Sequence, residues 1–229
     1  PMLRLTHSQT EPREFIGQLS LASLILILTM GVSIGLSISL IGALMPSIAL
    51  DLQLADSQAG IVQSIFFLGH IGGVFFARRF LANWSGSRLW LTAGWASAVG
   101  VTVCAGGNYG CLILGRCLAG FGLSLTVILA SSTLVTLAGA RSGSLLSSFH
   151  AVVAASAAAT MAFAPQLAAH LGTWQVTVAG CGFLCVCPLA MLVVVKMPNL
   201  VPSNSGDRQH GQHGAAAFFA LILIVAAYV

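Results

Sequence analysis

Three basic side chains lie in the apolar stretches of this sequence, namely Arg116, His70 and His150, and each can carry a charge or a proton. Arg116 lies about five residues inside its stretch, where a charged group is costly unless it faces water or the interior of a protein. We therefore expect it to face a helix-bundle interior, with snorkelling to the headgroups as the alternative. For His70, a neutral hydrogen-bonded ring is the simpler interpretation, and a titrating relay is the functional one.

Hydroxyl groups make up most of the other polar side chains of these stretches. Five of them are candidates to line a solute-binding cavity, because polar groups are costly against lipid: Ser37, Ser39, Ser131, Ser132 and Thr133. The alternative is that each hydroxyl bonds to a carbonyl of its own helix. The sequence leaves both interpretations open.

Neither an enzyme nor a metal site is predicted. The six cysteines lie in or beside apolar stretches with no zinc-type spacing, and we expect packing residues, with a Cys104–Cys111 disulfide as the alternative. His210 and His213 lie in a polar segment and fit a solvated linker better than a metal site. No Ser/His/Asp set lies at one depth, and the short Gly-x-Gly strings lack a preceding strand. We expect no cofactor and no metal.

The composition is that of a membrane protein. Hydrophobic residues make up 57% of the chain and charged residues 6%, whereas soluble domains carry roughly 25% charged residues. So few charges cannot cover a water-facing surface. The net charge of +4 reflects the scarcity of acids, so no nucleic-acid partner is predicted.

Six apolar stretches are long enough to cross a bilayer. They cover about residues 19–45 (ending at Pro46), 60–77, 89–105, 111–137, 145–169 and 175–195. We expect an all-α, polytopic membrane helix bundle of six transmembrane helices plus the start of a seventh. Its parts are a tail (1–18), the bundle (19–197), a linker (198–214) and an incomplete seventh helix (215–229).

Positive charge lies on one side of this topology. Eight of the nine Lys and Arg residues fall in the tail, the second and fourth connections and the segment after the sixth stretch. They are Arg4, Arg13, Arg78, Arg79, Arg88, Arg141, Lys196 and Arg208. The positive-inside rule then predicts a multi-pass protein of the cytoplasmic (inner or plasma) membrane, with its N-terminus in the cytoplasm.

The connection after the second stretch carries a recognisable motif. Residues 79–88 read Arg-Phe-Leu-Ala-Asn-Trp-Ser-Gly-Ser-Arg. This resembles the signature G-x-L-A-D-R-x-G-R-R of the major facilitator superfamily of transporters. In that family the acid and its basic neighbours latch two halves together, and Asn83 in its place implies a weaker latch. Gly86 suits a turn that needs positive φ, and Arg88 matches the last basic position.

A second motif surrounds Arg116. The family pattern L-x-x-x-R-x-x-Q-G-x-G is matched by Leu112, Arg116, Gly120 and Gly122, with Ala119 in place of Gln. The resemblance implies an interior Arg linked to proton coupling or to architecture. Gly120 and Gly122 are expected to allow close helix packing, as are the pairs Gly31/Gly35 and Gly69/Gly73.

Stretches around residues 44–69 and 141–174 resemble fucose-permease-type symporters more weakly, including Pro165 near the end of the fifth stretch. Those proteins use carboxylates in spans one and four, and this chain has none there. Proton coupling would therefore use His70, His150 or groups of another half, and sugar specificity is not carried over.

The resemblance implies the N-terminal half of a secondary carrier that works by alternating access. Its partners would be a small-molecule substrate, protons or sodium, the lipid bilayer and a C-terminal six-helix half in the same chain or a partner chain. The alternative is a non-transporting orphan half, either an assembly partner or inactive.

Overall fold

A computed structural model describes residues 21–80, 84–138 and 141–194, and within these ranges the chain is helical with no strand. The helices are α1 (Leu21–Asp51), α2 (Asp56–Phe80), α3 (Gly86–Cys104), α4 (Tyr109–Ala138), α5 (Ser142–Leu171), α6 (Trp174–Leu184) and α7 (Cys187–Val194). The predicted all-α class is confirmed. The predicted tail, linker and seventh helix, and Asn83, lie outside the described residues.

Five spans of the described chain are long and apolar enough to cross a membrane: α1, α2, α4, α5 and α6 continued into α7. The remaining helix, α3, has 19 residues, but Arg88 and several Gly, Ser and Thr residues lower its hydropathy. It packs between α4 and α6, so protein rather than lipid surrounds much of it.

Prolines produce the main differences from the expected spans. The first helix does not end at Pro46 but continues to Asp51, and Pro165 lies inside α5. A proline removes one backbone hydrogen bond, but without water the other backbone groups keep their helical partners. The sixth span, expected to be continuous, is broken between α6 and α7. Pro188 follows that break, where its missing N–H is least costly.

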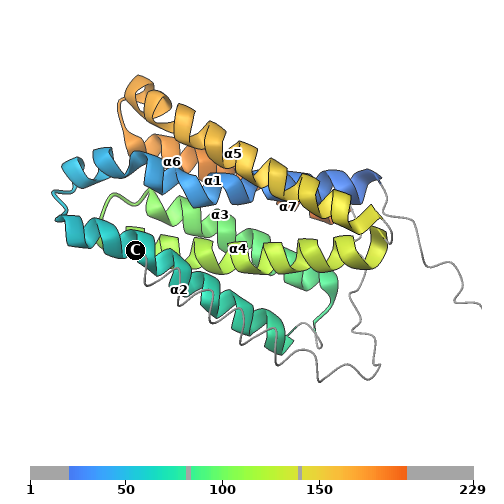
Figure 1. The fold of residues 1–229 in the computed structure, drawn as a ribbon. Helices are drawn as coiled ribbons and strands as arrows, with labels where there is room; N and C mark the ends of the chain where they lie inside the picture. The colour runs from blue at the N-terminus through green and yellow to red at the C-terminus, as the bar shows by residue number, and fades with distance from the viewer. Residues whose placement is uncertain (1–20, 81–83, 139–140, 195–229) are drawn as a thin grey trace, which may run out of the picture.

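The helices form two closely packed sets. The first places α4 between α2 and α3, and the second pairs α1 with α5 (Figure 1). The sets meet where α1 and α5 contact α4, whereas α1 and α2 touch only slightly. Large buried side chains, among them Leu44, Trp90, Leu125 and Phe149, fill the centre.

Glycines allow the first set to pack closely. A Cβ on Gly69 or Gly120 would collide with backbone of the facing helix, at Cys117 and Phe66 respectively. On the other side of α4, a Cβ on Gly122 would collide with Ser97 of α3. The expected packing role of Gly120 and Gly122 agrees with these contacts, because only glycine lets backbones approach this far.

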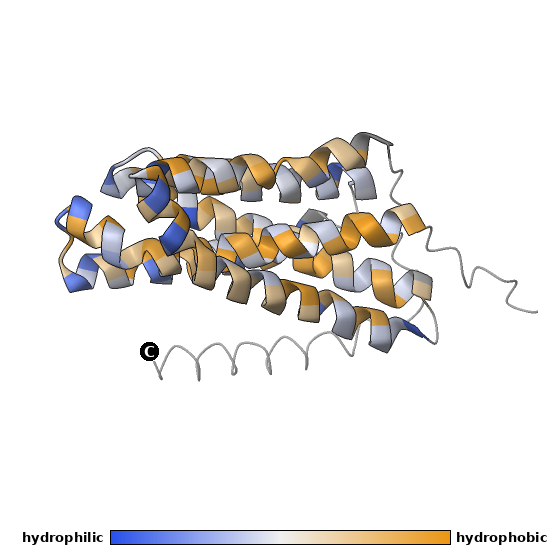
Figure 2. Ribbon diagram, turned by 90° about the horizontal axis from the view of Figure 1, so that it is seen from above, coloured by the Kyte–Doolittle hydropathy of each residue, from blue (hydrophilic) through white to orange (hydrophobic). Residues whose placement is uncertain are grey.

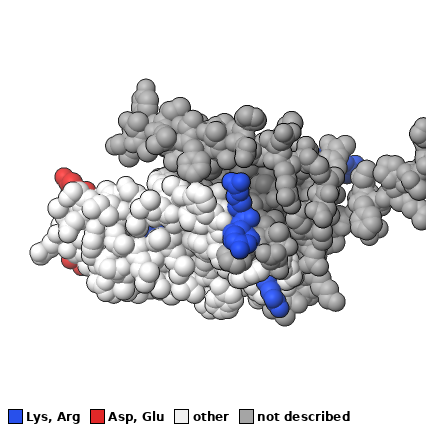
Figure 3. Space-filling model, turned by 90° about the horizontal axis from the view of Figure 1, so that it is seen from below, with Lys and Arg blue, Asp and Glu red and all other residues white. Residues whose placement is uncertain are grey.

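Polar residues mark the two ends of the bundle. The helix middles are predominantly apolar, and hydrophilic residues become more frequent toward the ends (Figure 2). Asp51 and Asp56 lie at one end, which we call the acidic end, while the surface arginines lie toward the other, the basic end (Figure 3). The basic-end residues are Arg78, Arg79, Arg88 and Arg141. This separation agrees with the charge asymmetry read from the sequence.

Candidate functional site

Arg116 lies in the interior of the bundle, as predicted. It sits about two turns into α4 from the acidic end, and its side chain is 3% exposed. The guanidinium is thus enclosed by protein and does not extend to the surface of the bundle, as the snorkelling alternative would require. Its neighbours come from α1, across the interface between the two helix sets, and from α2, within its own set.

Three neutral groups surround the guanidinium. Its Nη1 donates to the backbone carbonyl of Ser37 on α1 at 2.8 Å, and its Nη2 donates to Oε1 of Gln63 on α2 at 3.0 Å. One face of the guanidinium lies 4.1 Å from the centre of the Phe66 ring. The Nε is buried and has no partner among the described residues. Arg116 thus links α4 to α1 and α2, while one of its three guanidinium nitrogens has no partner among the described residues.

No carboxylate neutralises this charge within the described part of the chain. The acids there are Asp51 and Asp56, both at the acidic end, and neither forms an ion pair with Arg116. A buried charge without a counter-ion costs several kcal/mol, of which neutral acceptors and an aromatic face recover only part. The site therefore has a strong preference for a negative group.

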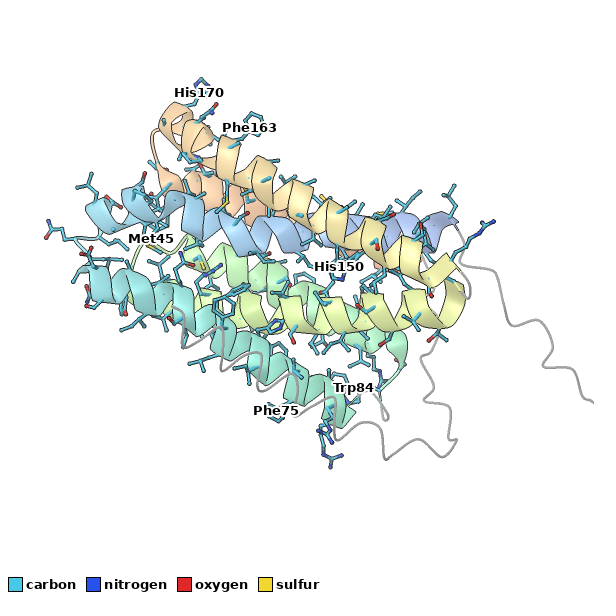
Figure 4. The ribbon with its side chains drawn as sticks, in the orientation of Figure 1. Met45, Phe75, Trp84, His150, Phe163 and His170 are labelled. Atoms are coloured by element: carbon cyan, nitrogen blue, oxygen red, sulfur yellow. The ribbon has the colours of Figure 1, made fainter. Side chains whose placement is uncertain are left out.

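The boundary between α1 and α2 lies beside this site. We call it the α1–α2 seam, bordered by Gly42 and Met45 on α1 and by Gln63 on α2, all half-buried. A Cβ on Gly42 would lie 3.7 Å from Nε2 of Gln63, so the absence of a side chain leaves the Gln63 amide room to move. Figure 4 shows Met45 between the ribbons of α1 and α2.

The other predicted candidates do not converge on Arg116. Ser39 is buried, and its hydroxyl donates to the carbonyl of Gly35 at 2.7 Å, which favours the interpretation that it bonds within its own helix. Ser131 and Ser132 are half-buried near the basic end of α4. His70 is half-buried on α2, and its buried Nδ1 has no partner among the described residues.

His150 lies on the surface of α5. It is exposed, packs edge-on against Phe149 at 5.3 Å between ring centroids, and lies between the ribbons of α5 and α4 in Figure 4. Phe163 and His170 point away from the bundle on the same helix. Within the described residues, no cluster of titratable groups therefore surrounds His70 or His150.

The loop motif differs from expectation at Gly86. This residue is buried, begins α3 and is not among the glycines with positive φ, which are Gly107 and Gly172 in the described chain. The sequence predicted that Gly86 lies in a turn. This prediction is wrong, because Gly86 is the first residue of α3. Arg88 lies exposed in the first turn of α3 at the basic end. Since Asn83 is outside the described residues, the latch stays a prediction.

A second polar cluster holds the acidic end together. Oδ2 of Asp51 accepts from Nε1 of Trp174 at 2.9 Å and from Nε2 of Gln175 at 3.1 Å. The cluster joins the end of α1 to the start of α6 and lies in the wall of an open cleft of about 410 Å³. Pro165 of α5 lines the same cleft. Arg116 does not, so the two sites are separate.

Sequence reasoning found Arg116 but missed its partners. Gln63 and Phe66 belong to a stretch that resembles a transporter subgroup, and a polar Gln facing a buried Arg is a signal that could have singled it out. The contribution of Ser37 is a backbone carbonyl, which no residue type reveals. All six cysteines are free thiols, so Cys104 and Cys111 are not joined. No group of His, Cys, Asp or Glu in the described residues could hold a metal.

Comparison with known proteins places these features in a family. The sequence profile of the Major Facilitator Superfamily matches residues 27–228, nearly the whole chain. No curated protein matches the chain.

Proposed function

The chain belongs to the major facilitator superfamily of membrane transporters, and from that premise we propose that it forms one half of a secondary carrier that moves a small solute by alternating access. The observation that carries the proposal is Arg116, a buried cation at the junction of α1, α2 and α4 to which the described residues supply no counter-ion. In alternating access, two bundles rock around a site near the bilayer midplane. A charged group in the membrane interior is a functional-site signal.

The second half is proposed to lie against α2 and α5. Only 11% of the most apolar stretch of α5 is buried, compared with 61% for α1. Much of its uncovered surface consists of alanine, for example Ala151, Ala155 and Ala158. Lipid gains little from such small side chains, whereas another helix can approach them closely. A second six-helix bundle, in the same chain or a partner chain, would cover this surface.

The proposed orientation places the basic end in the cytoplasm. The arginines at this end support it through the positive-inside rule. Single cysteines introduced into a cysteine-free background test it: Gln53→Cys at the acidic end and Ser144→Cys at the basic end, both exposed positions. A membrane-impermeant maleimide applied to intact cells should label the first, and the second only after permeabilisation. The reverse pattern would invert the topology.

The transport proposal is tested with the product of the complete reading frame, purified and reconstituted into liposomes. Uptake of a broad panel of radiolabelled sugars, amino acids, carboxylates and organic cations is measured with no gradient, a pH gradient and a sodium gradient. We expect saturable uptake of at least one solute above protein-free liposomes. A gradient that accelerates it identifies the coupling ion.

The uptake assay also has a result that would refute the carrier proposal. Absence of saturable flux for every solute and gradient, from protein that is folded by its circular dichroism, would refute the carrier proposal. It would leave the non-transporting alternative, an assembly partner or inactive half. An equilibrative flux that no gradient accelerates would keep transport but remove coupling to protons or sodium.

A further inference from the structure

The edge of the Arg116 guanidinium that offers free hydrogen-bonding capacity has a defined geometry. Among the described residues, Nε has no partner, and the neighbouring Nη2 is held only by the side-chain amide of Gln63. These two nitrogens lie on the same edge of the planar guanidinium, and two parallel N–H groups on one edge match the two oxygens of a carboxylate. The other terminal nitrogen, Nη1, is occupied separately by the Ser37 carbonyl.

From this geometry we infer that Arg116 is the binding site for the carboxylate of a small monoanionic substrate, which takes the Nε–Nη2 edge by displacing Gln63. The inference rests on the proposed carrier function and names its substrate class. The exchange replaces one neutral hydrogen bond with two charge-assisted ones and supplies the missing counter-charge. The bond from Nη1 to Ser37 remains, so Arg116 stays anchored to α1 while the anion binds.

The surroundings define which anions fit. One guanidinium provides one positive charge, and the described chain places no second cation beside it, so a dianion would keep an uncompensated charge. The Phe66 ring covers one face of the guanidinium and offers apolar surface to a short hydrocarbon body. Neutral solutes such as sugars would leave the guanidinium charge unpaired. A short-chain monocarboxylate satisfies all three conditions.

The α1–α2 seam supplies the movable part of the site. Gln63 is half-buried there, and Gly42 presents no side chain opposite its amide. Rotation of the Gln63 side chain exposes Nη2 beside the unused Nε without moving a helix. Gln63 thus acts as an internal, neutral substitute for the substrate carboxylate.

This role makes Gln63→Glu the decisive variant. The change is isosteric and places a built-in carboxylate at the atom that already lies 3.0 Å from Nη2. The variant should melt at a higher temperature than the original chain in chloride and lose its response to added carboxylate. Gln53→Glu is the matched control, because it adds the same charge at an exposed position of the acidic end.

The assay is thermal unfolding of the purified full-length protein in detergent. Sodium chloride is replaced stepwise by sodium acetate, propionate or L-lactate at constant ionic strength. The original chain and Gln53→Glu should melt several degrees higher in at least one carboxylate than in chloride. Gln63→Glu and Arg116→Gln should show at least a tenfold weaker response. Gln63→Ala should keep the response, since it removes only the competing amide.

Two outcomes would overturn the inference. Equal melting temperatures in chloride and in every carboxylate would show that no carboxylate binds, and an undiminished response in Gln63→Glu would place the anion elsewhere. Transport separates this result from the carrier proposal. Saturable flux of a neutral solute that persists in Gln63→Glu would keep the carrier and reject the anion site. A carboxylate response without flux of any solute would keep the site and reject the carrier.

Discussion

The hydrogen bond from Trp174 to Asp51 should make the acidic end of α1 and the start of α6 unfold together. Trp174 is 4% exposed, so its indole N–H has no ready access to water if Asp51 is replaced. A hydrogen bond to a charged group contributes about 1.5–3 kcal/mol, and one between neutral groups about 0.5–1.5 kcal/mol. Since Asp51 itself is exposed, the low end of each range applies.

A double-mutant cycle isolates this bond. Asp51→Asn removes the charge but keeps an acceptor, and Trp174→Phe removes the N–H but keeps an aromatic ring. We expect Asp51→Asn to lower the free energy of unfolding by about 0.5–1.5 kcal/mol, and the two changes to be coupled by about the same amount. The free energy is measured by unfolding in mixed micelles with increasing dodecyl sulfate, followed by circular dichroism.

Asp56→Asn provides the control for charge alone, because Asp56 lies at the same end in the first turn of α2. Its loss should cost about 0.3–1 kcal/mol through the helix dipole and show no coupling with Trp174→Phe. The reasoning fails if Asp51→Asn and Trp174→Phe are additive within about 0.3–0.5 kcal/mol, the usual limit for independent sites. Equal coupling of Asp56→Asn would also contradict it.

Two further substitutions test the packing. Gly35→Val should push α1 away from α5, where a Cβ would already collide with Ser156; we expect a loss of about 1–3 kcal/mol in the same micelle assay. Gly72→Val, with no neighbour within 4 Å, should be nearly neutral, and equal losses would count against the close α1–α5 contact. Thr173→Ala should cost about 1 kcal/mol, because the Thr173 side chain accepts from the N–H of Val176 at 3.3 Å and caps α6. Thr173→Ser should retain stability, and a Thr173→Ser loss as large as that of Thr173→Ala would exclude the cap as the cause.

Local sequence features predicted most of the fold. Apolar stretches long enough to span a bilayer became helices because lipid provides no other partner for backbone groups. Small residues at four-residue spacing, such as Gly69 and Gly73, became helix contacts. The separation of acidic and basic residues between the loops predicted the acidic end and the basic end of the bundle. Each of these inferences depends on properties that neighbouring residues share.

The details that escaped prediction depend on distant contacts. Pro46 was expected to end a helix, but it removes only one backbone hydrogen bond, and the helix continues to Asp51, whose side chain contacts Trp174 of α6. The partners of Arg116 lie 79 and 53 residues away in the sequence, and Trp174 lies 123 residues from Asp51. Only the packing of α1 against α4 and α6, and of α2 against α4, brings these groups together.

The position of Arg116 between the two helix sets gives a physical reason for ligand binding to affect helix packing. Glycine contacts fix α4 between α2 and α3, so this set is expected to move as one unit. The α1–α5 pair touches α2 only slightly, and the Arg116 side chain connects the two sides by one bond to Ser37 and one to Gln63. An anion that displaces Gln63 breaks the connection to α2 but keeps the one to α1. Substrate binding would therefore remove the polar bridge from Ser37 through Arg116 to Gln63 across the α1–α2 seam, while the bond from α4 to α1 and the glycine contacts within the α2–α3–α4 unit persist. Occupancy would then change the contacts that line the seam, which is the kind of coupling between occupancy and helix contacts that a carrier requires.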